Sequence, residues 1–188
     1  GWSYVEGAQL SPDESDERSS LKDVVLEKRL TESLKRINPW INDENLRKVI
    51  RDLTKTNYPN LVEANQAIWT QINQSVSVMQ DLGKGNKGQT VHIIDFEHPE
   101  NNEFLCTNQF KVSGVNQNII PDILCFVNGL PLAVIECKSP YLTDPMEAGI
   151  KQLMRYANRR KPENDEGAEK LFHYNLMMVS THINFKRN

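Results

Sequence analysis

Asp122, Glu136 and Lys138 are predicted to gather at one end of a β-hairpin. Asp122 precedes the apolar run 123–127, and Glu136 and Lys138 close the apolar run that follows the turn. Because the strands of a hairpin are antiparallel, the start of the first lies beside the end of the second. Two carboxylates and an ammonium placed there could hold a divalent metal beside a water and cut a phosphodiester.

Alternation along the second strand puts Glu136 and Lys138 on one face and Cys137 on the other. Mg²⁺ prefers oxygen ligands in an octahedron and keeps several waters. We therefore expect Asp122, Glu136 and the backbone carbonyl of Cys137 to bind Mg²⁺, with Mn²⁺ as the alternative ion. Lys138 would hold the attacking water and stabilise its deprotonated form. In the simpler interpretation, Asp122 caps a strand and Glu136 and Lys138 are a surface ion pair of little energetic weight.

The turn of the hairpin decides whether the two acids meet. A two-residue Asn128-Gly129 turn would place Asp122 on the face opposite to Glu136. A three-residue loop with the glycine as a left-handed bulge would shift the pairing and bring both acids to one face. We therefore predict the bulged loop, or an equivalent one-residue slip at Pro121 or Pro131.

A helix predicted after the hairpin carries a second group of polar residues. Gln152 and Tyr156 are four residues apart and share a face, which could bridge the metal site and a DNA backbone. A helix–sheet packing pair is the alternative interpretation. Lys151 and Arg155 form an adjacent basic stripe that suits phosphate contacts, although a solvated helix face would look the same.

The periodicity along the chain predicts helices, then a strand meander, a crossover helix and a last strand. This order is typical of an α/β (α+β) fold in which helices flank a central mixed β-sheet. A capping pattern at Ser20 opens the first helix, and the last element is a buried strand. The expected helices are Ser20 to about Ile37, about Asp43–Leu53, Asn60 to about Gly83, and Asp144 to about Arg159. The expected strands are Val91–Phe96, Phe104–Val112, Ile123–Val127, Leu132–Cys137 and Leu176–Ser180. The expected loops are the Gly83–Thr90 connector and the charged segment Lys161–Lys170.

Composition narrows the class of protein. The chain has 188 residues, 38% of them hydrophobic, and a net charge of −3, so any nucleic-acid contact must come from local patches. Three cysteines without paired spacing favour a reducing, cytoplasmic setting over a disulfide framework. No apolar run approaches the roughly 20 residues that span a bilayer, so we expect no membrane contact.

The ordered motifs resemble the PD-(D/E)xK nuclease superfamily in its RecB-like branch, with the added Gln-x-x-x-Tyr pair. Their wider context resembles the N-terminal nuclease domain of the R (restriction) subunit of type I restriction enzymes, over about residues 91–180. The flanking blocks that carry this resemblance are Ile94-Asp95-Phe96, Asn108-Gln109-Phe110, Pro121-Asp122, Asn128-Gly129-Leu130-Pro131-Leu132, Glu136-Cys137-Lys138-Ser139 and Phe172-His173-Tyr174-Asn175.

This resemblance implies an endonuclease with the PD-(D/E)xK restriction-endonuclease-like fold and extra N-terminal helices. It implies Mg²⁺-dependent cleavage of double-stranded DNA within a restriction-modification system, with Asp122 and Glu136 as metal ligands. Lys138 would be the catalytic lysine, and Gln152 and Tyr156 the accessory pair. Partner subunits would supply specificity and methylation. ATP would bind only in a helicase-type motor beyond residue 188.

The resemblance also implies a further acid from the first helix, for which Glu27 is our candidate and Glu32 and Asp23 are rivals. We expect residues 1–20 to be a polar, mobile lead-in. Residues 21–188 would form a single endonuclease domain, with a helical part at 21–83 and a catalytic sheet core at 84–188.

Two other functions fit the same residues. The chain could be a stand-alone resolvase or repair nuclease of the same superfamily. Alternatively, it could be a docking module with a decayed site that only tethers subunits. Helicase motifs farther along the polypeptide would argue against a stand-alone nuclease. A metal-dependent gain in thermal stability would argue against a docking module with a decayed site.

Overall fold

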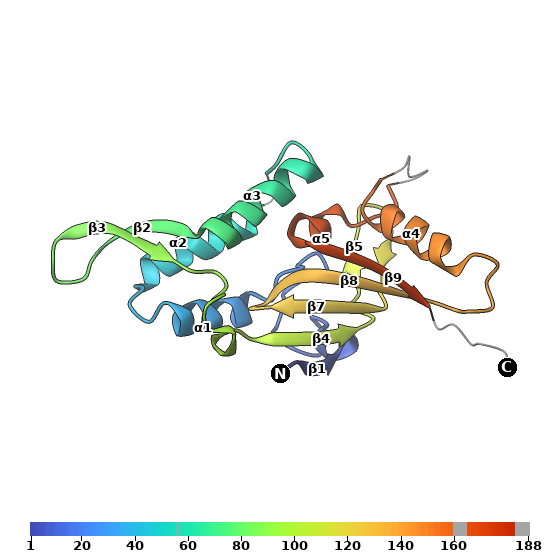
Figure 1. Cartoon of the computed structure of the whole chain (residues 1–188), viewed down its shortest axis with the longest axis horizontal. Helices are drawn as coiled ribbons and strands as arrows, with labels where there is room; N and C mark the ends of the chain where they lie inside the picture. The colour runs from blue at the N-terminus through green and yellow to red at the C-terminus, as the bar shows by residue number, and fades with distance from the viewer. Residues whose placement is uncertain (56, 160–164, 183–188) are drawn as a thin grey trace.

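The protein is described here by a computed structural model that covers residues 1–55, 57–159 and 165–182. Its centre is a mixed five-stranded sheet in the order β1-β4-β7-β8-β9 (Figure 1). The β4, β7 and β8 strands are antiparallel neighbours, whereas the two outer pairs, β1 with β4 and β8 with β9, are parallel. The strands are β1 (Ser3–Glu6), β4 (Phe104–Asn108), β7 (Ile123–Val127), β8 (Leu130–Lys138) and β9 (Met177–His182).

Three helices precede most of the sheet in sequence and form an arm at one end of the molecule (Figure 1). They are α1 (Glu27–Ile37), α2 (Asp43–Thr54) and α3 (Leu61–Gln74). Two more helices follow the β7–β8 hairpin, α4 (Pro145–Tyr156) and α5 (Glu169–Tyr174). The smaller elements are η1 (Gly7–Leu10), η2 (Pro99–Asn101), the pair β2 (Val76–Asp81) and β3 (Asn86–Val91), and the pair β5 (Val112–Ser113) and β6 (Asn118–Ile119).

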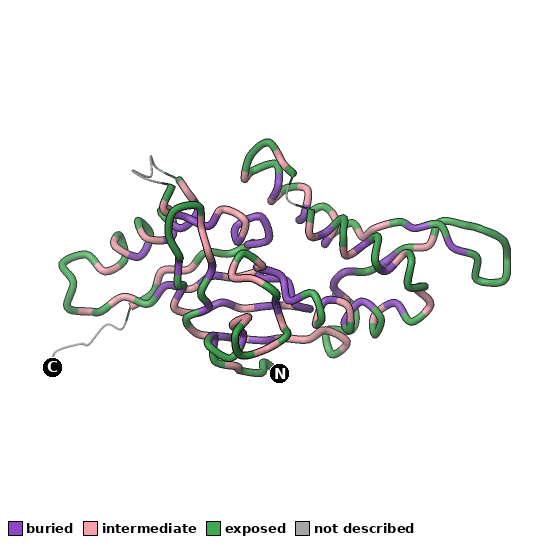
Figure 2. The backbone as a smooth tube through the Cα atoms, turned by 180° about the vertical axis from the view of Figure 1, so that it is seen from behind, coloured by how far each residue is buried: buried purple, intermediate pink, exposed green. Residues whose placement is uncertain are grey.

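The core lies on one face of the five-stranded sheet. Alternate residues of β4 and β7 are buried, among them Leu105, Leu124 and Phe126. Leu30 and Leu34 of α1 belong to the same hydrophobic cluster. Figure 2 shows buried segments along the central strands. The predicted mixed sheet flanked by helices is therefore confirmed. Among the described residues, no helix is long and apolar enough to cross a bilayer.

The N-terminal residues are integrated into the fold, so their interpretation as a separate lead-in is wrong. Ser3–Glu6 is an edge strand that pairs with β4, and Leu10 is buried in the core. Arg18 is also buried, where its guanidinium donates to the Leu10 carbonyl at 2.8 Å. A polar composition concealed these contacts, because they are made with residues far along the chain.

The first helix begins later than the capping pattern at Ser20 predicted. α1 starts at Glu27, and no side chain caps it. The Asp23 carboxylate instead accepts hydrogen bonds from the backbone N–H groups of Ser19 and Ser20. The pattern thus stabilises a turn that precedes the helix.

The third helix is shorter than predicted. It ends at Gln74, since Ser75 adopts φ 65°, which is incompatible with a right-handed helix. The residues that follow form the antiparallel β2–β3 hairpin, and the predicted connector Gly83–Thr90 supplies its turn and most of β3. Gln80 attaches the hairpin to the start of α2, donating to the Trp40 carbonyl and accepting from the Asn42 N–H.

Two predicted strands are shorter than expected. The prediction of a strand at Val91–Phe96 is wrong beyond its first residue, because the backbone of His92 pairs with the side chain of Asn38 rather than with a strand. β4 stops at Asn108, after which Gln109 adopts φ 45°. In both places the chain turns away from the sheet.

The C-terminal elements partly match the prediction. Residues 161–164 of the expected charged loop lie outside the described residues, and its end, from Glu169, opens α5 instead. α4 ends at Tyr156, three residues before the predicted end. The last strand is present but lies at the sheet edge with Met177 and Met178 exposed, so the prediction that it is buried is wrong.

Candidate active site

The β7–β8 hairpin has a two-residue turn, so the predicted three-residue loop is wrong. Val127 pairs directly with Leu130 across Asn128 and Gly129. Both turn residues have positive φ, 52° and 79°, as the tight hairpin turn requires. Gly129 also abuts the start of α1, where an added Cβ would lie 2.5 Å from the Leu26 carbonyl oxygen, so glycine is needed there for space as well.

A one-residue slip farther along the hairpin brings the two acids together. Phe126 pairs with Pro131, but the next residue, Cys125, pairs with Ala133. The predicted alternative, a slip at Pro131, is therefore confirmed. Continuing the register that joins Ile123 to Ile135 places Asp122 opposite Glu136.

Glu136 is the most deeply buried acid of the site, only 1% exposed. One carboxylate oxygen, Oε1, accepts from Lys138 Nζ at 2.7 Å, while the other, Oε2, is buried without a hydrogen-bond partner among the described residues. Burial raises the pKa of Glu136, the Lys138 ammonium opposes this rise, and the nearby Asp122 charge adds to it. The charged form of Glu136 thus lacks part of the stabilisation that it needs.

Asp122 is held by the strand that carries its partner acid. Its Oδ2 accepts from the backbone N–H of Cys137 at 2.8 Å. The same acid raises the pKa of the Cys137 thiol, after the larger effect of burial. Asp122 and Glu136 therefore interact across the hairpin, as the predicted cluster requires.

Gln152 and Tyr156 of α4 extend the cluster into one hydrogen-bonded network. Lys138 Nζ donates to Gln152 Oε1 at 2.6 Å, and Gln152 Nε2 donates both to Glu136 and to the Tyr156 hydroxyl, the latter at 2.6 Å. The Tyr156 hydroxyl donates to the Ile120 carbonyl at 3.3 Å. Burial, followed by the Glu136 charge, raises the pKa of Tyr156. The accessory pair thus faces the site rather than only packing against the sheet.

The position of α4 depends on its cap and on one close contact. Asp144 accepts from the Glu147 N–H at 3.0 Å, which confirms the predicted N-cap. An added Cβ on Gly149 would lie 2.1 Å from Ser180 Oγ, so only glycine allows the helix to approach β9 this closely. Ser180 Oγ in turn donates to the Met146 carbonyl at 3.2 Å.

No local sequence pattern indicated that β9 lies beside the site. The parallel register pairs Glu136 with Ser180 and Lys138 with His182. His182 has a buried Nδ1 without a hydrogen-bond partner among the described residues. A search for parallel strand partners of the acid-bearing strand could have suggested both residues, but the register itself is not readable from local sequence.

The basic stripe on α4 lies on its exposed side. Lys151 Nζ pairs with Glu147 at 2.7 Å, and Arg155 Nε lies 3.6 Å from Glu166. Both basic residues therefore already have acidic partners on the protein, and these partners would have to yield before either could contact a phosphate.

Glu27 lies away from the site, so the prediction that it supplies a further acid is wrong. The N–H of Leu26, the residue before it, donates to the Gly129 carbonyl at the turn end of the hairpin. Asp122 lies at the other end of β7, about 20 Å of extended strand away. Both rivals share this end of the molecule: Glu32 follows on the same helix, and Asp23 is bound in the turn before it. The start of α1 therefore packs against the turn end of the hairpin, away from Asp122.

The donor set fits Mg²⁺ in the form that uses few protein ligands. Among the described residues, no three His, Cys, Asp or Glu side chains cluster to hold a metal. Asp122 and Glu136 provide two carboxylates, and the free Glu136 Oε2 has no partner to displace. Mg²⁺ commonly binds one or two carboxylates and completes its shell with water and phosphate.

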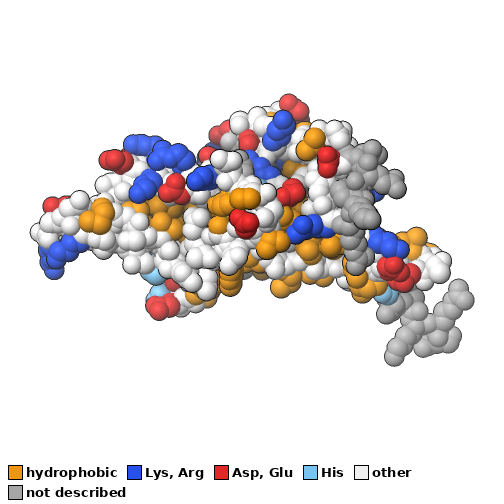
Figure 3. All heavy atoms as spheres, turned by 90° about the horizontal axis from the view of Figure 1, so that it is seen from above, with side chains coloured by type: hydrophobic (Ala, Val, Ile, Leu, Met, Phe, Trp, Pro, Cys, Tyr) orange, Lys and Arg blue, Asp and Glu red, His pale blue; other side chains and the backbone are white. Residues whose placement is uncertain are grey.

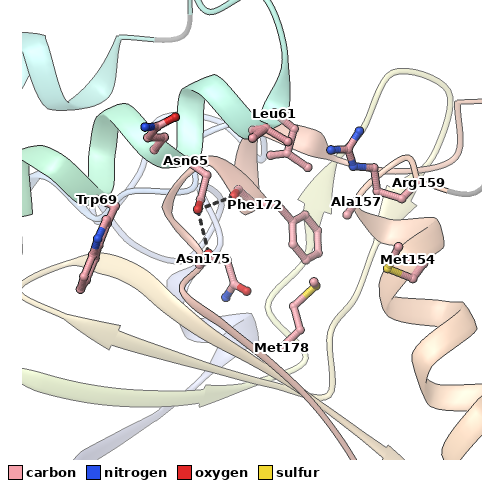
Figure 4. A pocket seen from close by; sticks show the side chains of 11 residues that line it. Leu61, Asn65, Trp69, Met154, Ala157, Arg159, Phe172, Asn175 and Met178 are labelled. Carbon is pink, nitrogen blue, oxygen red and sulfur yellow. Dashed lines mark hydrogen bonds between the residues drawn. The ribbon is translucent and has the colours of Figure 1, made fainter.

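Apart from this cluster, a hollow of about 520 Å³ lies between α3, α4, α5 and β9 (Figure 4). Its described lining is mostly apolar, and Arg159 is the ionisable side chain among those residues. Asn65 joins its walls by donating to the Asn175 carbonyl at 2.8 Å. Without a pair of titratable groups it offers no acid–base or metal chemistry, so the cluster at Asp122 is the candidate active site.

The fold and this cluster together define the class of an α+β nuclease-like domain. Residues 1–186 match the family model described as "Type I restriction enzyme R protein N terminus". The chain belongs to this family.

Proteins of similar sequence support the same assignment. The chain is 33% identical over 181 residues to the type I restriction enzyme HindI endonuclease subunit of Haemophilus influenzae, covering 95% of this chain and 16% of that protein. It is 35% identical over 143 residues to a protein of Methanocaldococcus jannaschii that carries the name of the type I restriction enzyme MjaIXP endonuclease subunit, covering 74% of this chain and 14% of that protein. The chain thus spans about a sixth or less of the curated relatives that it matches.

Proposed function

We propose that this chain is the endonuclease domain of a type I restriction enzyme R subunit and hydrolyses DNA phosphodiesters with Mg²⁺. One observation carries the proposal: a buried Glu136 carboxylate, with one oxygen on Lys138 and the other free, lies opposite Asp122. A buried carboxylate oxygen without a partner costs stability, and a metal ion bound between Glu136 and Asp122 would supply that partner. Membership of the R-protein family supports the same conclusion.

In the proposed reaction, Asp122, Glu136 and the Cys137 carbonyl hold the metal, with Mn²⁺ as the alternative ion. The bound ion would neutralise charge that develops on the phosphate and lower the pKa of a bound water. Lys138 holds the attacking water through its ammonium. At rest, that ammonium is kept beside the acids by Glu136 and Gln152, at 2.7 and 2.6 Å.

The accessory residues position the catalytic ones. Gln152 bonds Glu136, Lys138 and Tyr156 at once, so it fixes where the lysine ammonium lies relative to the acid. Lys151 and Arg155 would contact the DNA backbone from the exposed side of α4, exchanging Glu147 and Glu166 for phosphates.

The activity of the whole protein is part of the proposal. Double-stranded DNA is the substrate, and partner specificity and methyltransferase subunits direct the cut. An ATP-driven motor elsewhere in the polypeptide sets where cutting takes place. The net charge of −3 supports this division of labour, since a domain of that charge has little general attraction for DNA.

Cleavage by the assembled enzyme tests the proposal. The full-length subunit carrying Lys138→Ala would be combined with its partner subunits, plasmid DNA, Mg²⁺ and ATP. We expect ATP hydrolysis and DNA binding to persist while double-strand cleavage is lost. Lys48→Ala, at an exposed lysine of α2 in the helical arm, is the matched control and should cut normally. Normal cleavage by Lys138→Ala would refute the proposal.

A further inference from the structure

One face of the five-stranded sheet is largely apolar, and no other described residues form a layer over it. In β4 and β7 the buried residues alternate with partly exposed ones, and the partly exposed set points away from the core. In Figure 1 no helix crosses in front of β4, β7 and β8, and in Figure 3 hydrophobic side chains form a row along the lower edge of the same region. We call this surface the bare face, made of Trp2, Tyr4, Phe104, Cys106, Ile123, Cys125, Ile135, Met177 and Val179.

The exposure of this surface is unusual for such a sheet. Trp2, just before β1, is 56% exposed, and Tyr4 of β1 and Met177 of β9 are each 59% exposed. Both strands are outer strands of the sheet that carries the candidate active site. The solvated face of antiparallel strands such as β4, β7 and β8 normally carries polar side chains. A continuous apolar surface of this kind marks a site of association rather than a solvated face.

The chemistry of the bare face selects a protein partner over DNA. None of its nine residues is charged, and Glu6, at the end of β1, is the next side chain on that face of the strand. A DNA backbone requires cations, which this surface lacks. The aromatic pair Trp2 and Phe104, with ring centroids 5.2 Å apart, instead offers the rigid apolar contact typical of the centre of a protein interface.

We propose that the bare face is the docking surface for another domain of the same R subunit, downstream of this one. The family model describes the N terminus of a longer R protein, and the chain covers only 14% and 16% of two curated relatives. A covalently linked domain meets this face at an effective concentration of the order of millimolar, far above that of a second copy. Docking there would fix the catalytic residues, which lie on the opposite face of β8, relative to the rest of the subunit.

The alkylation rates of two cysteines would measure whether the bare face is covered. Cys106 and Cys125 lie opposite each other on β4 and β7, within the bare face, and both thiols are free. The full-length subunit and the 188-residue chain would be alkylated with a maleimide in parallel and analysed by peptide mass spectrometry. We expect both thiols to react about 10-fold or more slowly in the full-length subunit. A cysteine introduced as Val62→Cys, on the exposed side of α3, should react at the same rate in both.

Three results would overturn the proposal. The first is equal reactivity of Cys106 and Cys125 in the two proteins. The second is protection in the 188-residue chain that grows with its concentration, which would assign the face to a second copy. The third is protection that appears only when the partner subunits are added. None of these readouts involves DNA cleavage, so they stand apart from the proposed nuclease activity.

A charge placed on the face provides a second, independent test. In the full-length subunit, Tyr4→Lys should restore rapid alkylation of Cys106 and Cys125, because a buried, unpaired ammonium opposes docking. The Tyr4 side chain is 59% exposed in this chain, so the same change should leave the thermal stability of the 188-residue chain nearly unchanged. Val62→Lys, at a similarly exposed apolar residue, is the matched control. Continued protection of both cysteines in Tyr4→Lys would contradict the proposal.

Discussion

The two ends of the β7–β8 hairpin bury polar side chains to the same extent but use them differently. At the turn end Asn128 is fully buried, and at the other end Glu136 is 1% exposed. Asn128 donates to the Ile93 carbonyl and to Asn102, each at 2.9 Å, and accepts from the Glu103 N–H at 2.8 Å. At the turn end, every polar atom of the buried side chain is paired.

The site end lacks this completeness. Glu136 has one paired and one unpaired oxygen, and its charge faces a second acid, Asp122. A satisfied buried network stabilises a fold, whereas a partly satisfied one costs stability and persists where function requires it. Hydrogen bonding, rather than burial or polarity alone, therefore distinguishes the turn end of this hairpin from the site end.

The largest expected effect is on catalysis. Glu136→Gln keeps the size of the side chain and removes its charge, so metal binding is lost and DNA cleavage by the assembled enzyme should fall by about 10³-fold or more. Because burial raises the pKa of Glu136, the folded state disfavours its charge at neutral pH. Without metal, the free energy of unfolding should therefore not decrease. Rates of plasmid cleavage and urea denaturation would check the two halves of this prediction.

Glu147→Gln is the matched control, since this exposed acid on α4 pairs with Lys151 outside the cluster. It should cut within a few-fold of the unaltered enzyme. A large loss of stability in Glu136→Gln would instead make Glu136 resemble Asn128, and the contrast between the two ends would disappear.

The turn end should show the reverse pattern. Asn128→Ala removes three side-chain hydrogen bonds. It also places alanine at φ 52°, a left-handed conformation that asparagine tolerates better. We expect the free energy of unfolding to fall by about 3 kcal/mol. Urea denaturation of the variant measures this loss. Mg²⁺ should still raise the free energy of unfolding of this variant. If it does not, the turn also shapes the site.

Metal binding should stabilise only the site end. Mg²⁺ or Mn²⁺ at about 100 times its Kd should raise the free energy of unfolding by about 2.7 kcal/mol. Thermal melts with and without the ion would show this shift in the unaltered chain but not in Asp122→Asn, where one ligand is lost. The same shift in both proteins would place the ion elsewhere, and no shift in either would favour the docking-module interpretation.

The smallest expected effect comes from another buried polar atom without a hydrogen-bond partner, which lies outside the hairpin. Nδ1 of His173 in α5 lacks a hydrogen-bond partner among the described residues, and burial, aided by the Lys170 charge, lowers the pKa of His173. The unfolded chain thus binds a proton more readily, so stability is complete above about pH 6.5 and declines as pH falls through that value.

Thermal melts between pH 5 and 8 would measure this decline, and His173→Gln should flatten it. Cleavage at neutral pH should be unaffected. A loss of cleavage in His173→Gln would extend the functional region into α5, whereas an unchanged pH profile would remove histidine burial as its cause.

Local sequence was sufficient to predict the elements that carry the residues of the candidate site. The β7 bounds and the Asp144 cap of α4 were predicted from alternation and capping, which depend on neighbouring residues alone. The same holds for the shared face of Glu136 and Lys138, because side-chain direction in a strand has a period of two. Gln152 and Tyr156 were correctly placed together by the four-residue spacing of a helix.

The helical arm was predicted less well, because tertiary contacts outweigh local patterns there. Val76 fits a helical period after Ile72, yet the buried Gln80 attaches its segment to α2 as a strand. Glu27 was chosen from its place at the edge of an apolar stripe, but that stripe fixes only which side of the helix is buried. The stripe does not fix which end of the hairpin the helix meets.

Residue types and their spacing are enough to identify which side chains could bind a metal and which face of its own strand or helix each one occupies. The tertiary structure alone decided that Asp122 lies opposite Glu136, through a slip at Pro131, and that β9 lies beside Lys138. It alone also left one sheet face bare. The physical reason is that side-chain direction follows from backbone geometry within a few residues, whereas register and covering depend on packing between segments that are distant in the chain.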